Sequence, residues 1–361
     1  MTGEIVLLLT HSEDFYTVDR VAEHLERRGA RPVRLDTDRF PGEIRLTQEV
    51  AGGRTRHRIS GPGIAEALGT ATLDAAEVAA VWTRRFWPAP LEGLAPEFHR
   101  ECRLQIRETL EGFLDGLGGA RWINDLAPLW RAGNKLRQLR LAAELGLAVP
   151  RTVVTNDPEP VRSLYRATGG RVVTKLLLPL SMSMTVAPRS VPTSALGDDD
   201  LEALDGLDFA PMIFQEHLAK REELRVVMIA GRAYVGSIDA SRSAAGQTDW
   251  HLASVDEVAW RPGHLDAAVS ARLAALHDAL GLVSGVSDFI VTPQGEAVFL
   301  EVNPLGEWGM LERDLGLPIS EAFAAALLGQ SPPEREGPDR EPPDPLTSNP
   351  GLRPDAAKER A

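Results

Sequence analysis

The stretch that decides the fold, residues 286–304, reads VSDFIVTPQGEAVFLEVNP, with two apolar runs joined by the turn sequence TPQG. An antiparallel hairpin centred within that turn sets Asp288 opposite Glu301. Asn303 follows two residues later and therefore points to the same face of its strand. Two carboxylates and an amide in one cluster supply the oxygen ligands with which proteins hold Mg²⁺ beside substrate phosphates.

The alternative is an ordinary hairpin with scattered polar groups on its surface. Each of the three polar residues has apolar neighbours along the chain, and a buried carboxylate without a cation or a donor is costly. We therefore favour a metal site formed by Asp288, Glu301 and Asn303. A bulge at Gly295 would shift the pairing by one residue.

The composition indicates a globular, cytosolic protein. Its 361 residues allow two or three domains, and 43% hydrophobic with 25% charged residues is ordinary for an enzyme. A net charge of -13 without a basic stripe argues against binding to nucleic acid. Cys102 is the only cysteine, so no internal disulfide forms. The short aliphatic run at residues 5–9 predicts a first strand rather than a secretion signal, and no run is long enough to cross a membrane.

The N-terminal part, residues 1–124, reads as an α/β domain. It opens with a βαβ unit over residues 4–36, whose helix covers residues 15–28 and ends at Gly29. The segments that follow predict a hairpin formed by residues 43–50 and 54–60 and then a strand over residues 79–86. A long helix is predicted over residues 97–117.

Two further units and a tail follow. Residues 125–212 predict a second α/β unit, and residues 213–330 a third unit that contains the hairpin described above. Residues 331–361 are rich in proline and charge and predict disorder. The expected elements are helices over 133–145, 159–167, 265–280 and 320–328, strands over 171–177 and 211–218, and a hairpin over 223–241 that turns at Ala230 and Gly231.

Several charged residues are candidates for binding an anionic ligand. Lys175 follows β-branched residues in a strand, and Lys135 begins a helix. Glu223 and Arg225 lie two residues apart and therefore on the same face of one strand. Glu223 is suited to accept hydrogen bonds from ribose hydroxyls, and Arg225 is suited to neutralise phosphate. Taken singly, each of these residues is better explained as a solvated charge. The end of the preceding apolar strand, Gln215–Leu218, offers backbone groups to a purine edge.

The chain resembles the ATP-grasp ligases and, within them, the graspetide synthetases, the microviridin-type enzymes that macrocyclise ribosomal peptides. The matching segments, in chain order, are VLLLTHSEDFYTVDRVAEHLERRGARPVRLDTDRF (6–40), VWTRRFWPAP (81–90), NKLRQLRLAAELGLAVPRT (134–152), IFQEHLAKREELRV (213–226) and FLEVNPLGEWGMLERDLGLPI (299–319). The resemblance covers roughly residues 3–328. It implies an α/β fold, α+β in parts, in which a pre-ATP-grasp domain precedes central and C-terminal ATP-grasp subdomains.

The resemblance also implies roles for particular residues. Lys135 and Lys175 match lysines that contact the ATP phosphates and the adenine pocket, and Arg225 matches a phosphate-binding arginine; we expect Lys175 and Arg225 to act in catalysis. The remaining matches are the adenine hinge at Gln215, Glu216, His217 and Leu218, the ribose acceptor Glu223, and the Mg²⁺ ligands Asp288, Glu301 and Asn303. The phosphate-covering loop of many ATP-grasp enzymes is rich in glycine, whereas residues 176–188 here contain none.

The implied reaction is macrocyclisation of a ribosomal precursor peptide that carries a leader and an acidic core. ATP would convert Asp or Glu side chains of the core into acyl phosphates, with release of ADP, and a Ser or Thr hydroxyl or a Lys amine would then displace phosphate. Arg84 and Arg85 are candidates to receive the acidic side chains, although paired arginines at a strand end are also commonly solvated. Trp250 and His251 are expected near the same cleft, with no catalytic role for the histidine.

Two other functions remain open. The chain could be an ATP-grasp ligase that joins free amino acids or adds glutamate to a protein, or a nucleotide-binding protein without turnover. The intact set of candidate site residues argues against the latter. VWTRRFWPAP and NPLGEWGMLE favour the macrocyclase over the amino-acid ligase. No motif encodes the oligomeric state, for which a homodimer is the common default.

Overall fold

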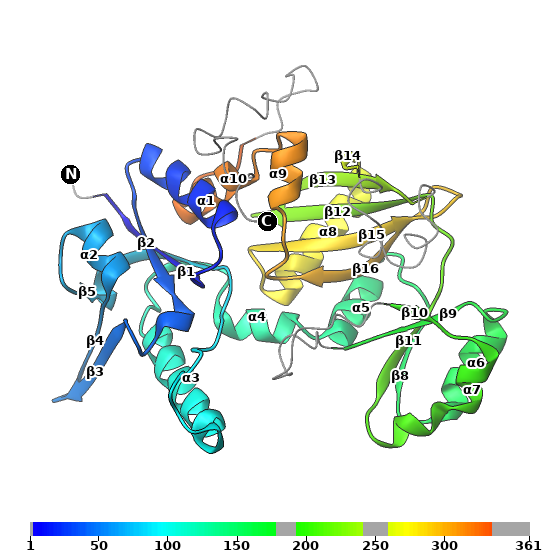
Figure 1. Cartoon of the computed structure of the whole chain (residues 1–361). Coiled ribbons are helices and arrows are strands. Elements are labelled where there is room, and N and C mark those ends of the chain that lie inside the picture. The colour runs from blue at the N-terminus through cyan, green and yellow to red at the C-terminus, as the bar shows by residue number, and fades with distance from the viewer. Residues whose placement is uncertain (1–2, 178–192, 241–258, 334–361) are drawn as a thin grey trace, which may run out of the picture.

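A parallel sheet forms the centre of the N-terminal domain in the computed structural model, which describes residues 3–177, 193–240 and 259–333. The strand order is β2-β1-β6-β7, and Figure 1 shows β1 beside β2. Every residue of β1 is buried, as its unbroken run IVLLLT predicts for a central parallel strand. The sheet and its first helix comprise β1 (Ile5–Thr10), α1 (Tyr16–Arg27), β2 (Arg31–Asp36), β6 (Val78–Thr83) and β7 (Arg121–Ile123).

A smaller antiparallel sheet projects from this domain. Its strands β3 and β4 join through Gly52 and Gly53, whose positive φ values of 58° and 73° suit a tight hairpin turn, and the pairing confirms the predicted hairpin. The elements of this part are β3 (Arg45–Ala51), β4 (Arg54–Ser60), α2 (Pro62–Leu68), β5 (Leu73–Asp74) and α3 (His99–Asp115).

The central subdomain is a four-stranded sheet in the order β10-β9-β11-β8. Because β11 pairs with both β8 and β9, this sheet extends to Glu216. The expected boundary between residues 212 and 213 therefore falls within this strand. The elements are α4 (Leu126–Ala132), α5 (Lys135–Glu144), β8 (Thr152–Thr155), α6 (Pro158–Ala167), β9 (Val172–Lys175), β10 (Ser194–Ala195), α7 (Asp198–Glu202) and β11 (Met212–Glu216).

The C-terminal subdomain is a five-stranded sheet in the order β14-β13-β12-β15-β16. Ala230 and Gly231 form the β12–β13 turn, as predicted, and both have positive φ. The elements are β12 (Glu222–Ile229), β13 (Arg232–Asp239), β14 (Arg261–Pro262), α8 (Ala267–Leu280), β15 (Ser284–Val291), β16 (Ala297–Asn303), α9 (Gly309–Leu315) and α10 (Ile319–Leu327).

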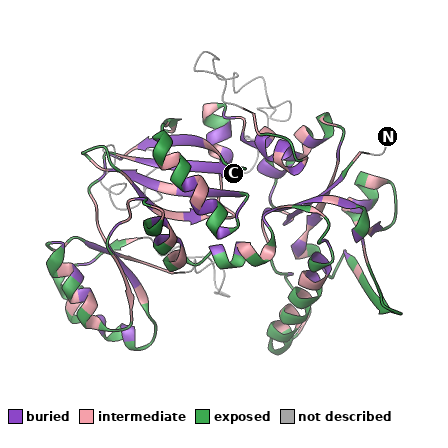
Figure 2. Cartoon of the chain, turned by 180° about the vertical axis from the view of Figure 1, so that it is seen from behind, coloured by how far each residue is buried: buried purple, intermediate pink, exposed green. Residues whose placement is uncertain are grey.

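The two faces of the five-stranded sheet have different surroundings. On one face, buried residues such as Val226 and Phe289 pack with Leu273 and Leu276 of α8. On the other, Val227 and Val286 belong to a core shared with α1, α10 and the N-terminal sheet. Figure 2 shows these strands as largely buried and the outward surfaces of the helices as exposed. The second face keeps a polar row at one end, where the candidate site lies.

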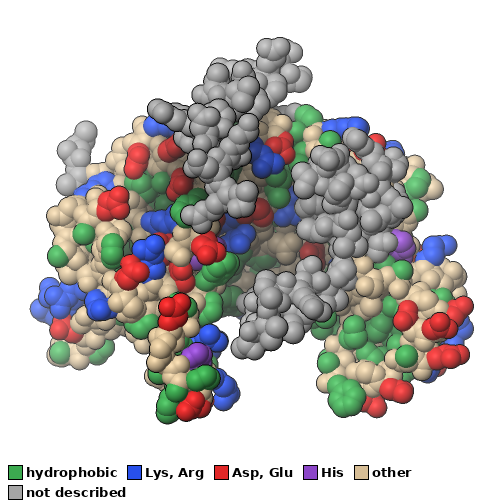
Figure 3. All heavy atoms as spheres, in the orientation of Figure 1, with side chains coloured by type: hydrophobic (Ala, Val, Ile, Leu, Met, Phe, Trp, Pro, Cys, Tyr) green, Lys and Arg blue, Asp and Glu red, His purple; other side chains and the backbone are tan. Residues whose placement is uncertain are grey.

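Four short helices of the described residues were not predicted from the sequence: α2, α4, α7 and α9. The predicted tail lies mostly outside the described residues, which end at Pro333, where the backbone oxygen accepts a hydrogen bond of 2.9 Å from Tyr234. Over the described residues, no helix is both long and apolar enough to traverse a lipid bilayer. Acidic and basic side chains are interspersed over the face seen in Figure 3, so the net negative charge is not gathered in one patch there.

Candidate active site

The β15–β16 hairpin places Asp288 directly opposite Glu301, as predicted. Nearer the turn, however, Phe289 pairs with Phe299, so the tip of the hairpin is one residue out of the predicted register. Leu300 is the extra residue between the two pairs, and this bulge restores the predicted partnership at the carboxylates. Gly295, whose φ is 91°, ends the turn and donates its N–H to Thr292 O at 2.9 Å, and the one-residue shift at the tip is the shift expected of a bulge there. The second irregularity, at Leu300, lies next to the site.

The three candidate metal ligands converge in space. The Nδ2 of Asn303 lies 3.4 Å from Asp288 Oδ2 and 3.3 Å from Glu301 Oε1. Rotation of the amide about its last bond would present Oδ1 in place of Nδ2. Two carboxylates and an amide oxygen fit a hard cation that shares its coordination sphere with phosphate. No cluster of three or more His, Cys, Asp and Glu side chains suited to a metal occurs in the described part of the chain.

Two lysines surround the Glu301 carboxylate. Its Oε2 lies 2.8 Å from Lys135 Nζ at the start of α5 and 3.7 Å from Lys175 Nζ at the end of β9. Burial alone would raise the pKa of Glu301, but the charges of Lys175 and Lys135 outweigh it and lower the pKa to about 2. Burial lowers the pKa of Lys175, and Glu301 opposes that effect. Elements from two subdomains thus bring one carboxylate and two ammonium groups together.

Arg225 completes a row of charges across three adjacent strands. It pairs with Asp288 across β12 and β15, and Asp288 pairs in turn with Glu301 on β16. Its Nη1 lies 2.9 Å from Asp288 Oδ1, while Nε and Nη2 donate to the backbone oxygen of Glu307 at 3.0 and 2.7 Å. The guanidinium is therefore fixed at three of its nitrogens beside the candidate metal ligands.

The predicted adenine hinge lies at the end of β11. The backbone N–H of Glu216 donates to Arg151 O at 2.8 Å, and that of His217 donates to Arg171 O at 3.0 Å. These two donors are engaged within the protein, which differs from the expectation that they are open to a purine. Gln215 is buried and donates through Nε2 to Thr152 Oγ1 at 3.0 Å, and Leu218 follows the strand.

Glu223, the predicted ribose acceptor, lies on β12 two residues before Arg225. Its Oε1 accepts a hydrogen bond of 2.6 Å from Lys220 Nζ, so that a cation already accompanies the buried carboxylate. Both side chains of this pair lie near the junction of the central and C-terminal sheets.

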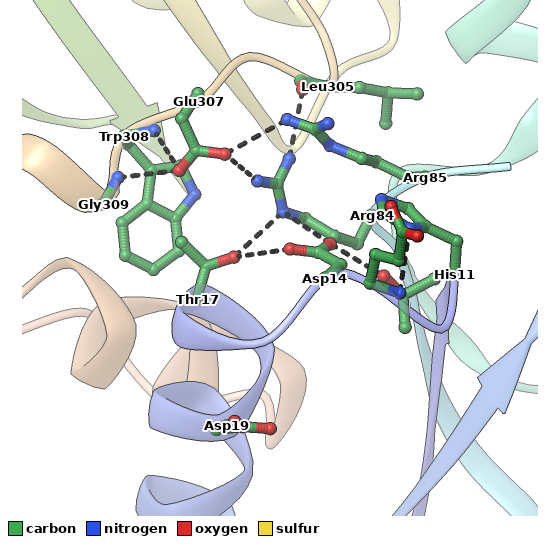
Figure 4. A network of polar contacts seen from close by, with 12 residues as sticks. His11, Asp14, Thr17, Asp19, Arg84, Arg85, Leu305, Glu307, Trp308 and Gly309 are labelled. Atoms are coloured by element: carbon green, nitrogen blue, oxygen red, sulfur yellow. Dashed lines mark hydrogen bonds and ion pairs between the residues drawn. The ribbon is translucent and has the colours of Figure 1, made fainter. Parts of the chain in front are cut away.

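The two candidate substrate arginines differ in exposure. Arg84 lies within a network of polar contacts (Figure 4) and is 2% exposed. By contrast, 34% of the Arg85 side chain is exposed. Both bind the carboxylate of Glu307, a residue to which no role was assigned from the sequence. The alternative of a solvated pair does not describe Arg84, which is buried. Trp250, His251 and most of the glycine-free loop lie outside the described residues.

Comparisons with known proteins agree with this fold. Residues 5–129 match the family model described as the MvdD pre-ATP grasp domain. Macrocyclase MdnB from Microcystis aeruginosa MRC is 42% identical, with a TM-score of 0.73 over 90% of this chain and 99% of that one. A Chryseobacterium gregarium RiPP-associated ATP-grasp ligase, solved with ADP and a leader and core peptide, is 27% identical, with a TM-score of 0.82 over 91% of this chain and 98% of the other.

Curated relatives are more distant. A ribosomal protein bS6–L-glutamate ligase of Salmonella paratyphi B is 25% identical over 249 residues, which cover 68% of this chain and 77% of that protein. A probable α-L-glutamate ligase of Teredinibacter turnerae is 30% identical over 112 residues, 30% of this chain, and the match spans only 36% of that relative's length. Fold and relatives together define an ATP-grasp ligase, and hence an enzyme. More narrowly, the chain belongs to the graspetide synthetase family.

Proposed function

We propose that this enzyme uses ATP and Mg²⁺ to macrocyclise a ribosomal precursor peptide. The observation that carries the proposal is the row of Arg225, Asp288 and Glu301 across β12, β15 and β16, with Lys135 and Lys175 beside it. Such a row suits the transfer of a phosphoryl group, and the chain is 42% identical to a protein described as a macrocyclase.

The proposed reaction has two steps. A side-chain carboxylate of the peptide attacks the γ-phosphorus of ATP, the bond to ADP breaks, and an acyl phosphate forms. A Ser or Thr hydroxyl or a Lys amine of the same peptide then attacks the acyl carbon, inorganic phosphate leaves, and the nucleophile loses its proton. Each ester or amide ring therefore removes one water from the peptide.

The chain's residues would divide the work as follows. Lys135, Lys175 and Arg225 would bind the phosphates, and Arg225, already held by Asp288, would stabilise charge on the transferred group. Asp288, Glu301 and Asn303 would hold Mg²⁺, which neutralises phosphate charge when bound. For the nucleoside, we assign binding of the ribose to Glu223 and binding of the adenine to the segment Gln215–Leu218. The backbone N–H groups of Glu216 and His217 are not part of this assignment, because they already donate within the protein.

For the peptide, Arg85 is the stronger of the two arginine candidates. Its side chain is partly exposed, and it lies at the C-terminal end of β6, where ligands of open α/β sheets bind. The precursor we expect has a leader and an acidic core with Ser, Thr or Lys. In the Chryseobacterium ligase, a leader and a core peptide are bound together with ADP, which supports this choice of substrate class.

The alternative is a ligase that adds glutamate to a protein, which the Salmonella relative favours at 25% identity. Incubation with ATP, Mg²⁺ and a candidate precursor, followed by mass spectrometry, separates the two reactions. Macrocyclisation lowers the peptide mass by one water per ring and releases ADP and phosphate. A gain of glutamate residues on an added acceptor protein, with the peptide unchanged, would support the alternative.

A further inference from the structure

The loop between β16 and α9, residues 304–308, is held from two sides, and Glu307 provides both contacts (Figure 4). Its side-chain Oε1 accepts hydrogen bonds from the backbone N–H groups of Trp308 and Gly309 at 3.1 and 2.9 Å, where α9 begins. Its Oε2 binds the guanidinium groups of Arg84 and Arg85. One carboxylate thus joins the start of α9 to the end of β6.

The charge on Glu307 is maintained by these contacts. Burial alone would raise its pKa, but the charges of Arg84 and Arg85 and the N–H of Gly309 together lower the pKa below its usual value. The residue is therefore ionised at neutral pH, and its contacts with the arginines are charge-assisted hydrogen bonds.

Arg84 anchors the loop to the N-terminal domain. Its Nε lies 3.2 Å from Thr17 Oγ1 at the start of α1 and 3.5 Å from Asp14 Oδ2, and its Nη1 donates to Leu305 O at 3.2 Å. A buried arginine that loses one of its carboxylate partners is left with an incompletely compensated charge. The geometry of the loop therefore depends on residues of the first domain.

The same loop reaches the catalytic row through its backbone. The carbonyl oxygen of Glu307 accepts two hydrogen bonds from Arg225, and the third contacting nitrogen of that arginine faces Asp288. Two donors on one acceptor fix the plane of a guanidinium group. The space beneath the loop is tight, because a Cβ on Gly306 would lie 2.5 Å from Val286 Cβ.

We propose that Glu307 is a positioning residue, held by Arg84 and Arg85, that sets the orientation of Arg225 for phosphoryl transfer. The inference rests on the proposed function only in assigning Arg225 to the phosphates. On this proposal the N-terminal domain takes part in catalysis, because Arg84 and Arg85 hold Glu307 and Glu307 orients the guanidinium group of Arg225. A displacement of a catalytic group by about 1 Å costs on the order of 10²-fold in rate.

A double-mutant cycle tests this coupling. Glu307→Gln keeps the size of the side chain and an acceptor for α9 but removes the charge that binds Arg84. We expect a loss of about 10- to 100-fold in the rate of peptide-dependent ADP formation, with KM for ATP changed by less than about threefold. In an Arg225→Met background Glu307→Gln should change the rate less than about twofold, because the arginine through which Glu307 acts is absent.

The matched control is Glu321→Gln on α10. Glu321 pairs with Arg28 of the N-terminal domain at 2.9 Å, so its substitution removes another ion pair between the same two parts of the chain, one that includes neither Glu307 nor Arg225. The control should keep the wild-type rate. Equal rate losses for Glu307→Gln with and without Arg225, or a wild-type rate in Glu307→Gln, would overturn the proposal.

A second variant covers the case in which Glu307→Gln does not fold. Arg84→Lys keeps a positive charge but loses the guanidinium group that contacts Glu307, Thr17 and Leu305 together. The rate of ADP formation should therefore fall when this substitution is made in the wild type, and not when it is made in Arg225→Met. Equal losses in the two backgrounds would contradict the proposal. If the variants change the rate of ADP formation as expected but the peptide keeps its original mass, the result would count against macrocyclisation. The positioning role of Glu307 would still be supported.

Discussion

Lys135 Nζ lies 2.8 Å from Glu301 Oε2, so the carboxylate that we assign to the metal already has a cationic partner. Lys175 lies farther away, at 3.7 Å from the same oxygen. A divalent cation placed at this carboxylate would meet the repulsion of both ammonium groups unless phosphate balances them. We therefore expect metal and nucleotide to bind together more readily than metal alone.

Replacement of Lys135 tests this relationship. In Lys135→Gln, Mg²⁺ or Mn²⁺ should bind the nucleotide-free protein about tenfold more tightly, because one repulsive charge is lost, whereas ATP should bind more weakly. Titration calorimetry of metal alone, and of ATP with metal, measures both effects. Unchanged or weaker metal binding by the variant would contradict the proposed ligand role of Glu301.

Arg85 offers a test of peptide binding. Arg85→Ala should raise KM for the precursor by at least about tenfold, since a charge-assisted contact to a carboxylate is worth roughly 1.5–3 kcal/mol. KM for ATP should change little, because Arg84 still binds the Glu307 carboxylate when Arg85 is removed. Separate titrations of peptide and ATP distinguish these outcomes, and an unaltered KM for the peptide would remove Arg85 from the substrate site.

Asn124 links the N-terminal sheet to the start of β15. Its Oδ1 accepts hydrogen bonds from the backbone N–H groups of Val283 and Ser284 at 2.7 and 3.0 Å, and the residue is 1% exposed. Asn124→Ala leaves the N–H groups of Val283 and Ser284 without this acceptor, the second of them buried, and should lower the free energy of unfolding by about 2–4 kcal/mol.

Asn134→Ala provides the comparison for that measurement. Asn134 caps the exposed start of α5 by accepting from Arg137 N at 2.9 Å, so its loss should cost only about 1 kcal/mol. Urea unfolding of the two variants measures both losses in the free energy of unfolding. An equal or smaller loss in Asn124→Ala would mean that its hydrogen bonds do not hold the two domains together.

His277 on α8 should make stability depend on pH. It is buried, neither ring nitrogen has a hydrogen-bond partner among the described residues, and burial lowers its pKa from 6.5 to about 4. The unfolded chain therefore takes up a proton at a higher pH than the folded chain. The resulting loss of stability begins as the pH falls below about 6.5 and reaches roughly 3 kcal/mol near pH 4.

His277→Leu should remove this component of the pH dependence. The difference in unfolding free energy between pH 7.5 and pH 5, measured with urea, should be smaller in the variant than in the wild type. The same difference in both proteins would show that His277 is protonated equally in the folded and unfolded chains.

Local patterns predicted more of the fold than of the contacts within the site. The position of the turn correctly set Asp288 against Glu301, although the tip of the hairpin is out of register and Leu300 compensates for it. Helix α4 was missed because Pro128 interrupts its seven residues, and α9 was missed because it is equally short and begins at a glycine. Such helices depend on tertiary packing rather than on local propensity.

Long-range pairing accounts for the burial of Arg84, which the sequence did not predict. Its partner Glu307 is 223 residues away, and nothing in the local sequence VWTRRFWPAP distinguishes a buried arginine from an exposed one. The acidic residue in NPLGEWG was visible as part of the resemblance, but its two contacts arise only when the loop is placed between β6 and β12. Similarly, the backbone donors of the adenine hinge were predicted to be open because their carbonyl partners belong to other segments.

The central claim, that Asp288, Glu301 and Asn303 hold Mg²⁺ during activation of a peptide carboxylate, is tested most directly by the rate of peptide dehydration in Asp288→Asn and Glu301→Gln. Both substitutions keep side-chain size and remove charge, while Glu296→Gln at the exposed tip of the same hairpin serves as the control. Mass spectrometry of a precursor incubated with ATP and Mg²⁺ should show loss of water with release of ADP in wild type and control. Both site variants should be slower by about 10² or more, equivalent to roughly 2.7 kcal/mol in the barrier. Dehydration at the wild-type rate by both variants would contradict the account.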